Sequence, residues 1–175
     1  MAAFFIFLFL TPWGKNLKEW VSSLTLSTPN MEQNIAPNDA YITMDWALIS
    51  DEGTKVIFSE IDKPIFLNIW ATWCGPCRSE MGSIEDLYNT YGDRVEFLLV
   101  SPTEGLEIVK KFKASRNESI PLYVNGSQIP PNLYGGVFPT TFIISKEKEI
   151  VLKSEGAHDW NAADVHQFLD ALLEK

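Results

Sequence analysis

The chain has only two cysteines in 175 residues, and both lie in one Cys-x-x-Cys, at Cys74 and Cys77. No other thiol remains for a structural disulfide, and no second pair completes a four-thiolate zinc site. A bridge across so short a loop constrains the unfolded chain very little, which argues against a structural staple. Redox chemistry is the function that these exclusions leave.

Histidine is equally scarce, because only His158 and His166 are present, both far downstream of the cysteines. A zinc or copper site would need further ligands beside the two thiols. We expect His158 in a loop and His166 at a solvated helix position. The sequence therefore predicts no metal site.

Basic residues are few, with 14 Lys and Arg against 23 Asp and Glu, a net charge of -9 and a pI near 4.7. Nucleic-acid binding needs clustered basic residues to contact phosphates, so we expect no nucleic-acid partner. Apolar residues at 46% and charged residues at 21% are typical of a globular protein. The negative charge then serves solubility.

Long apolar runs are missing too, because "MAAFFIFLFL" holds nine apolar residues after Met1 before "TPWGK" interrupts it. A membrane-spanning helix needs about 20 such residues, and a signal peptide begins with positive charge, whereas the first here is Lys15. The following "NLKEWVSSLTL" has helical apolar spacing suited to a membrane interface. We interpret residues 1–26 as a hydrophobic and amphipathic segment, a truncated membrane anchor, with a short cleavable signal or a buried helix as alternatives.

One folded domain is expected after this segment, because 175 residues are too few for two domains of ordinary size. Residues 27–40 carry Pro29 and Pro37 among polar residues, which is typical of a linker. We therefore assign residues 41–175 to a single domain.

The first half of this domain begins with alternating apolar residues on either side of "SDEGTK", which predicts a hairpin turning at residues 51–53. "PIFLNIW", residues 64–70, is the continuous apolar run of a buried strand. Apolar residues then recur at helical spacing up to Gly92, and "VEFLLV", residues 95–100, predicts another buried strand. A right-handed crossover makes these two strands parallel.

The second half predicts a helix around residues 106–112, a short strand at 121–124, and an antiparallel pair, "TTFIIS" and "EIVLKSEG", joined by the turn "KEKE". Asn161 is expected to cap a final helix. The core face of that helix is expected to hold Val165, Phe168, Leu169 and Leu172. This order predicts an α/β fold of three layers, in which helices cover both faces of a mixed central sheet.

The Cys-x-x-Cys lies where a buried strand ends and a helix begins. The Cys74 sulfur there faces unpaired N–H groups and the positive end of the helix dipole, which favours the thiolate. Pro76 suits the first helical turn, and Gly75 leaves room for a substrate sulfur. Cys77 lies four residues before Met81 on the core-facing stripe. We predict that Cys74 is the exposed nucleophile and that Cys77 is the more buried, resolving thiol.

The stretch "KPIFLNIWATWCGPCRSE", residues 63–80, resembles the thioredoxin superfamily, and more narrowly its TlpA/ResA branch of extracytoplasmic thiol-disulfide oxidoreductases. Cytoplasmic thioredoxins have a buried Asp where this chain has Asn68. Relatives in the branch have a Glu matching Glu80 and an opening hairpin similar to "DWALISDEG". The resemblance runs from about Tyr41 to the C-terminus.

The resemblance implies a thioredoxin fold with an N-terminal β-hairpin and a central insertion, residues 106–131. In "GGVFPTTFII" it implies that Pro139 is cis and faces the dithiol, and that Phe138 offers its backbone to a substrate peptide. The implied substrate-binding residues are Trp73, Gly75, Pro76, Phe138 and Pro139. Two positions depart from the pattern, because Gly82 replaces a helix-kinking proline and Phe138 is bulkier than usual, which would restrict substrates.

Glu80 is three residues beyond Cys77, on a neighbouring part of the helix surface. A nearby carboxylate can accept the proton that the resolving thiol must lose, provided that burial raises its pKa. A solvated helix carboxylate is the alternative. Because Asn68 cannot titrate, we predict that Glu80 takes the role that the buried Asp has in thioredoxin.

The resemblance implies a reductant of protein disulfides in the periplasm or on the outer face of the cytoplasmic membrane, with clients such as apocytochrome c. It also implies a membrane electron donor and a membrane tether. We expect a monomer with no cofactor beyond the Cys74–Cys77 disulfide. A disulfide oxidase or isomerase and a non-catalytic peptide-binding module remain alternatives. A peroxidase is less suited, since its reactive thiol lies in a different local motif.

Overall fold

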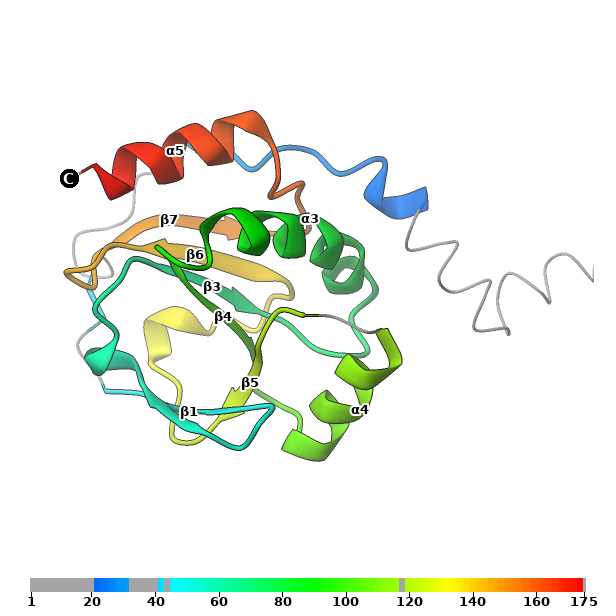
Figure 1. Cartoon of the computed structure of the whole chain (residues 1–175). Coiled ribbons are helices and arrows are strands. Elements are labelled where there is room, and N and C mark those ends of the chain that lie inside the picture. The colour runs from blue at the N-terminus through cyan, green and yellow to red at the C-terminus, as the bar shows by residue number, and fades with distance from the viewer. Residues whose placement is uncertain (1–20, 32–40, 43–44, 117–118, 175) are drawn as a thin grey trace, which may run out of the picture.

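The computed structural model describes residues 21–31, 41–42, 45–116 and 119–174 (Figure 1). The predictions for residues 1–20 and for most of the linker lie outside these ranges. Residues 21–23 form a helical turn at the end of the expected N-terminal segment. Within the described ranges, no helix combines the length and the apolar character needed to cross a membrane.

A seven-stranded mixed sheet forms the middle layer, with the strands in the order β2-β1-β5-β4-β3-β6-β7 (Figure 1). Strand β3 is parallel to β4, and β4 to β5, whereas the other neighbours are antiparallel. The strands are β1 (Ala47–Ser50), β2 (Lys55–Ile57), β3 (Ile65–Ile69), β4 (Glu96–Ser101), β5 (Leu122–Asn125), β6 (Thr140–Ile144) and β7 (Ile150–Glu155). The predicted mixed sheet, its opening hairpin and its parallel β3–β4 crossover are confirmed.

Helices cover both faces of the sheet, as predicted, but the helices differ in kind. The α-helices α3 (Gly75–Tyr91), α4 (Leu106–Arg116) and α5 (Ala163–Leu173) all contribute buried residues to one core cluster. The cluster on the other face takes residues from the 3₁₀ helices η1 (Phe58–Glu60) and η2 (Pro131–Leu133). The chain therefore folds as a three-layer α/β protein.

Strand alternation decides which side chains face the α-helices. On β3, Phe66 joins the cluster under the α-helices, while Ile65 and Leu67 join the opposite one. Because side chains alternate between faces, Asn68 points to the same side as Phe66. Thr141 is its partner across the antiparallel β3–β6 pair. Two buried polar side chains therefore lie beneath the α-helical layer.

Asp51 ties the opening hairpin to the expected insertion. Its Oδ1 accepts a hydrogen bond of 3.0 Å from the backbone N–H of Leu122, and its Oδ2 lies 2.9 Å from Nζ of Lys113 on α4. The turn beside it has Gly53 at a φ of +88°, which favours glycine. The residues of the insertion thus form α4 and β5, and β5 lies between β1 and β4.

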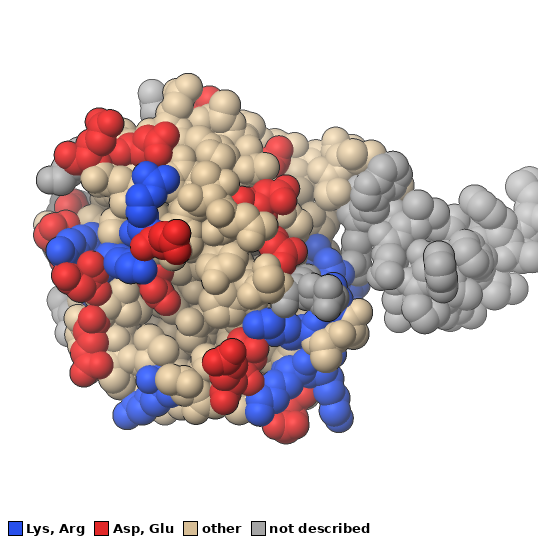
Figure 2. Space-filling view, viewed as in Figure 1, with Lys and Arg blue, Asp and Glu red and all other residues tan. Residues whose placement is uncertain are grey.

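The positive side chains of α4 are offset by neighbouring carboxylates. Figure 2 shows Lys and Arg gathered around α4, at the lower right, with Asp and Glu among them. Besides the Lys113–Asp51 pair, Lys110 Nζ lies 3.6 Å from Glu107 Oε1. The Lys110–Glu107 pair is exposed and contributes little stability, whereas the side chains of Lys113 and Asp51 are only partly exposed.

The predicted cap of the last helix is wrong. Helix α5 begins at Ala163, and its N-cap, Ala162, makes no side-chain hydrogen bond. Asn161 instead has its Oδ1 2.8 Å from Nε2 of His166. The side chain that could have satisfied a backbone N–H is thus engaged by an imidazole one turn further on. Its core face is as predicted, because Val165 and Leu169 are buried.

Helix α3 is terminated as the sequence predicts and is continuous through its glycine. It has proline in its first turn, and the N–H of Gly92, its C-cap, donates to the carbonyl of Tyr88 at 2.8 Å. Gly82 lies within this single α-helix, where an added Cβ would meet no atom within 4 Å. The absence of the kinking proline thus leaves α3 unbroken.

Candidate active site

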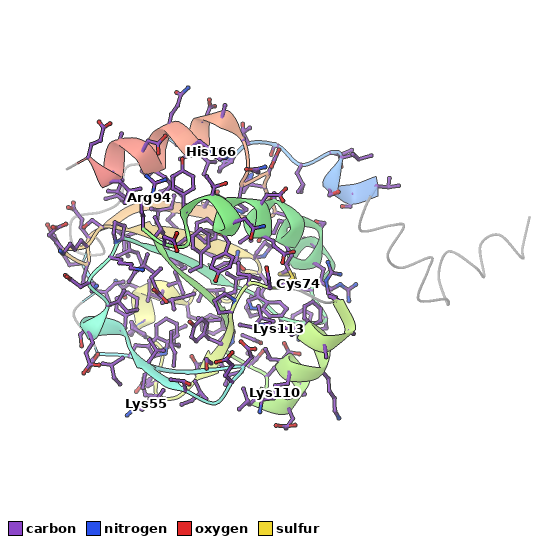
Figure 3. The ribbon with its side chains drawn as sticks, viewed as in Figure 1. Lys55, Cys74, Arg94, Lys110, Lys113 and His166 are labelled. Carbon is purple, nitrogen blue, oxygen red and sulfur yellow. A yellow bond between two sulfur atoms is a disulfide. The ribbon has the colours of Figure 1, made fainter. Side chains whose placement is uncertain are left out.

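Cys74 occupies the junction that the sequence predicts, between the end of β3 and the start of α3. It is the N-cap of α3, and its Sγ accepts a hydrogen bond of 3.2 Å from the backbone N–H of Cys77. A sulfur that accepts an N–H at the positive end of a helix dipole is stabilised as a thiolate. Figure 3 places Cys74 at that end of α3, with a sulfur bond beside it.

The two cysteines form a disulfide, with S–S 2.08 Å and Cα–Cα 5.3 Å, so the structure shows the oxidised protein. Cys77 has 1% of its surface exposed and Cys74 has 5%. The predicted order of burial is therefore confirmed, but the prediction that Cys74 is exposed is wrong for this state. The disulfide holds the Cys74 sulfur against the Cys77 sulfur, which covers part of the Cys74 surface.

Glu104 anchors the loop in front of the dithiol. Its carboxylate accepts hydrogen bonds from the Thr72 N–H at 2.7 Å, from the Thr72 hydroxyl, and from the Ser101 hydroxyl at 2.8 Å. Arg78 Nη1 donates to the Thr72 carbonyl at 3.2 Å. These contacts tie residues just before Cys74 to the end of β4 and to α3. No motif in the sequence signals this role of Glu104.

Glu80 is completely buried, so the alternative of a solvated helix carboxylate is wrong. Its Oε1 accepts from Asn68 Nδ2 at 2.9 Å, and its Oε2 accepts from Trp160 Nε1 at 2.9 Å and from the His158 N–H at 3.1 Å. Burial raises the pKa of Glu80 from 4.5 to about 7, although the three donors oppose the shift. Glu80 can therefore take up or release a proton near neutral pH.

Asn68 orients this carboxylate from below. Its Nδ2 donates to Glu80 Oε1 and also to Thr141 Oγ1 at 2.8 Å, so both of its N–H bonds are used. The sequence identified Asn68 only as a side chain that cannot titrate. The alternation of side chains along β3 could have shown that Asn68 faces α3, where Glu80 lies. We infer that Asn68 holds the Glu80 carboxylate in position, at a strand position where a second carboxylic acid would otherwise lie.

Trp160 and the backbone of His158 were missed by the sequence analysis. They belong to the loop after β7, and Ser83 holds that loop by accepting a hydrogen bond of 3.1 Å from the Trp160 N–H. His158 lies in a loop as predicted, but its contribution is a backbone N–H. The Trp160 bond joins residues 80 positions apart, so no local pattern marks it.

An apolar surface lies beside the dithiol. The Phe138–Pro139 peptide bond is cis, as the resemblance implied. The ring of Trp73, with 64% of the residue exposed, stands edge-on to the Phe138 ring at 5.6 Å between centroids, and Tyr134 lies 6.0 Å from Phe138. Val137 is 43% exposed next to them. Exposed aromatic groups of this kind favour contact with another molecule.

Gly75 and Pro76 form the first residues of α3, with Gly75 half-buried and Pro76 exposed. The surface between the two cysteines is therefore accessible from outside. Across the described ranges, no group of three or more His, Cys, Asp or Glu residues is placed to hold a metal ion. The chemistry that this arrangement supports is thiol exchange with a buried proton acceptor.

Comparisons with known proteins agree with this geometry. The sequence pattern of the AhpC/TSA family matches residues 40–153. The chain is 33% identical over 108 residues to the thiol-disulfide oxidoreductase ResA of Bacillus cereus, covering 60% of this chain and 62% of that protein. It is 34% identical over 112 residues to ResA of Geobacillus thermodenitrificans, covering 63% of each. It thus matches less than two thirds of these relatives.

Solved structures show the same fold. A DsbE-like thiol:disulfide interchange protein of Chlorobium tepidum aligns with a TM-score of 0.65 at 24% identity, over 77% of this chain and 96% of that one. The exposed lipoprotein thioredoxin Etrx1 of Streptococcus pneumoniae aligns at 0.60 with 22% identity, over 75% and 100%. The predicted thioredoxin fold is confirmed.

Proposed function

We propose that this chain, which belongs to the AhpC/TSA family, is a thiol-disulfide oxidoreductase that reduces protein disulfides through Cys74 and Cys77. The observation that carries the proposal is the Cys74–Cys77 disulfide at the start of α3 with the buried, titratable Glu80 on the same helix. The ResA relatives, named thiol-disulfide oxidoreductases, support it.

The first step is attack by the Cys74 thiolate on one sulfur of a substrate disulfide. A bond forms between Cys74 Sγ and that sulfur, the substrate S–S bond breaks, and the other substrate sulfur leaves as a thiolate. The helix N-terminus and the Cys77 N–H, which donates to Cys74 Sγ at 3.2 Å, favour the attacking thiolate. The product is a mixed disulfide between Cys74 and the substrate.

The second step resolves the mixed disulfide. Cys77 loses its proton to the Glu80 carboxylate, one turn further along α3, and then attacks Cys74 Sγ. The Cys74–Cys77 bond forms, and the bond to the substrate breaks with release of its second thiolate. Two electrons have then passed to the substrate, which ends as a dithiol. The protein ends as the disulfide and needs a dithiol donor to reduce it again.

Substrate binding is assigned to Trp73, Gly75, Pro76, Phe138 and Pro139, of which Pro139 is buried behind the surface that the others form. Neither the N–H nor the carbonyl of Phe138 is hydrogen-bonded to another described backbone group. An extended substrate segment can use these two groups as an added strand. The exposed ring of Trp73 then contacts the residues that flank the substrate cysteine.

Replacing Phe138 by valine is expected to widen the range of protein substrates. Phe138 contacts Trp73 and Tyr134, so a smaller side chain opens the surface beside the dithiol. We expect reduction of a bulky folded protein disulfide to speed up by about tenfold, the lower end of the roughly 10–200-fold that a change of pocket size typically makes. The rate with glutathione disulfide, which is too small to meet the ring, should not change. An equal change in both rates would contradict this prediction, because it would mean that the substitution alters the reactivity of the dithiol and not the access of large substrates.

The proposed setting is outside the cytoplasm, on the outer face of the membrane or in the periplasm, with a membrane electron donor and a membrane tether. The name of the Streptococcus pneumoniae neighbour, an exposed lipoprotein thioredoxin, supports such a setting. Apocytochrome c is the proposed client, because its haem-binding cysteines must be reduced before haem attachment. We propose that the protein acts as a monomer.

A measured reduction potential tests the direction of electron flow. Thioredoxin lies near about -270 mV, and strongly oxidising dithiols lie near about -120 mV. Equilibration of purified protein with defined ratios of reduced and oxidised dithiothreitol, with the redox state read by alkylation, should give a value closer to the first. A value above about -150 mV would favour a disulfide oxidase or isomerase instead.

A further inference from the structure

A short N-terminal stretch, residues 27–31, lies against the loop that follows β7, residues 156–162, and we call these the strap and the loop. Ser27 and His158 form a parallel bridge, and the Asp159 N–H donates to the Ser27 carbonyl at 3.0 Å. Figure 1 shows the strap, in blue, running along the start of α5 close to this loop. The strap is thus docked on the domain by backbone contacts.

Side chains reinforce the docking. His158 Nδ1 lies 3.4 Å from Ser27 Oγ and 3.3 Å from the Ser27 carbonyl oxygen. Pro29 is buried, and Met31 packs against the core cluster beneath the α-helices. A buried proline and an apolar contact imply that the strap has one preferred place on the surface.

The same loop supplies two of the three hydrogen bonds to the Glu80 carboxylate. These are the His158 N–H at 3.1 Å and Trp160 Nε1 at 2.9 Å. Ser83 holds the loop to α3, accepting from the Trp160 N–H and donating to the Glu80 carbonyl at 2.8 Å. The backbone of His158 therefore meets the strap through its bridge and Glu80 through its N–H.

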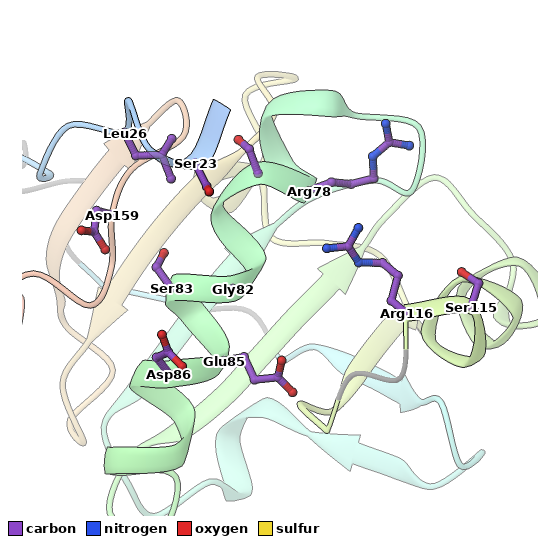
Figure 4. A pocket seen from close by; sticks show the side chains of 11 residues that line it. Ser23, Leu26, Arg78, Gly82, Ser83, Glu85, Asp86, Ser115, Arg116 and Asp159 are labelled. Carbon is purple, nitrogen blue, oxygen red and sulfur yellow. The ribbon is translucent and has the colours of Figure 1, made fainter. Parts of the chain in front are cut away.

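An open groove of about 650 Å³ borders the loop along the outer side of α3. Figure 4 shows Asp159, Leu26 and Ser83 on one side of it and Arg78 and Arg116 on the other. An added Cβ at Gly82, in its floor, would meet no atom within 4 Å. The loop is therefore held on one side by Ser83 of α3 and on another by the strap.

We propose that the strap is a positioning element for Glu80, because its docking on His158 and Asp159 holds the loop whose donors fix the carboxylate. The inference rests on the proposed role of Glu80 as the proton acceptor. The strap acts through the loop, and its docking is thereby linked to the proton transfer of the dithiol.

The direction of the effect follows from what surrounds Glu80. Asn68 faces it from β3, the His158 N–H and the Trp160 indole face it from the loop, and Cys77 precedes it on α3. The titratable groups of the loop are the His158 ring, held at Ser27, and Asp159. Burial is the largest cause of the raised pKa, and the donors oppose it. Opening the loop to water therefore lowers the pKa of Glu80 toward its ordinary value.

The test uses the full chain in its oxidised form. Pro29→Asp puts an unpaired carboxylate in a buried position and should undock the strap. Leu24→Asp is the matched control, because Leu24 is 67% exposed. We expect Pro29→Asp to speed hydrogen exchange of the His158 amide at least tenfold. It should also lower the Glu80 pKa, read by carboxyl NMR, from about 7 by a unit or more. Leu24→Asp should change neither quantity.

Two further variants keep the test decisive. Met31→Asp, at a less buried position, replaces Pro29→Asp if that protein does not fold. Trp160→Phe keeps an aromatic side chain in the loop and removes the indole donor, which favours the charged carboxylate, so the Glu80 pKa should rise rather than fall. Unchanged His158 exchange in the strap variant, or faster exchange with an unchanged Glu80 pKa, would overturn the proposal. None of these readouts needs a substrate, so they stand apart from failure of the proposed exchange activity.

Discussion

Replacing Cys74 by serine should abolish reduction of protein disulfides. The serine hydroxyl is not ionised at neutral pH and cannot form a mixed disulfide, even beside the Cys77 N–H that favours a thiolate. We expect the rate to fall at least about a thousandfold, which is typical for loss of a covalent nucleophile. The measurement is the rate at which a fluorescent, disulfide-linked peptide pair is separated in the presence of excess dithiothreitol.

The control for this variant is its stability, because Cys74 is the N-cap of α3. Serine is itself a good N-cap, so the thermal unfolding midpoint should match that of the reduced wild-type protein. A variant that folds normally and keeps more than about a tenth of the wild-type rate would contradict the assignment and place the nucleophile at Cys77.

Replacing Glu80 by glutamine should remove the pH dependence of the resolving step. Glu80 has a pKa of about 7 in the oxidised protein, so its carboxylate accepts protons best from neutral pH upwards. We expect the rate of resolution at pH 7 to fall about a hundredfold, measured by stopped-flow decay of a preformed mixed disulfide. The exposed carboxylate of Asp86, on the same helix, gives the control, and Asp86→Asn should keep the wild-type profile. A wild-type profile in Glu80→Gln would reject the role.

The same variant has a second readout in the stability of the oxidised protein. Because burial raises the pKa of Glu80 from its ordinary value of 4.5 to about 7 in the folded protein, its contribution to stability is full below pH 4.5 and is lost as the pH rises through 7. A shift of this size corresponds to about 3 kcal/mol. The free energy of unfolding of wild type minus that of Glu80→Gln, from denaturant titrations, should fall by about that amount from pH 4 to pH 8. A difference that stays constant would mean that Glu80 is not buried as described.

The fold was largely predictable because its strongest signals are local. The continuous apolar run of β3 and the helical spacing of α3 each predicted an element to within a residue or two of its observed bounds. The order of strands across the sheet has no such signal, because it depends on pairing between distant segments. The structure shows that β5 lies between β1 and β4. There, Asp51 of the opening hairpin pairs with Lys113 of α4, which precedes β5.

The site residues that are close in sequence were predictable, but the partners that distant segments contribute were not. Cys74, Cys77 and Glu80 lie within seven residues, so one helix start was enough to bring them together. The environment of Glu80 is built by Asn68 from β3 and by a loop about 80 residues away. The sequence therefore placed Glu80 near the helix surface, whereas tertiary packing buries it. Asn161 failed as a cap for a related reason, because a side chain can bond to more than one neighbour.

The proposed exchange depends most on Cys74 as the attacking thiol and on Cys77 as the thiol that releases the substrate. The direct test is a Cys77→Ser variant mixed with a disulfide-bonded peptide and analysed by mass spectrometry without reductant. We predict a covalent adduct on Cys74 that persists and is released by dithiothreitol. Peptide binding without an adduct would contradict the account and favour a non-catalytic binding module.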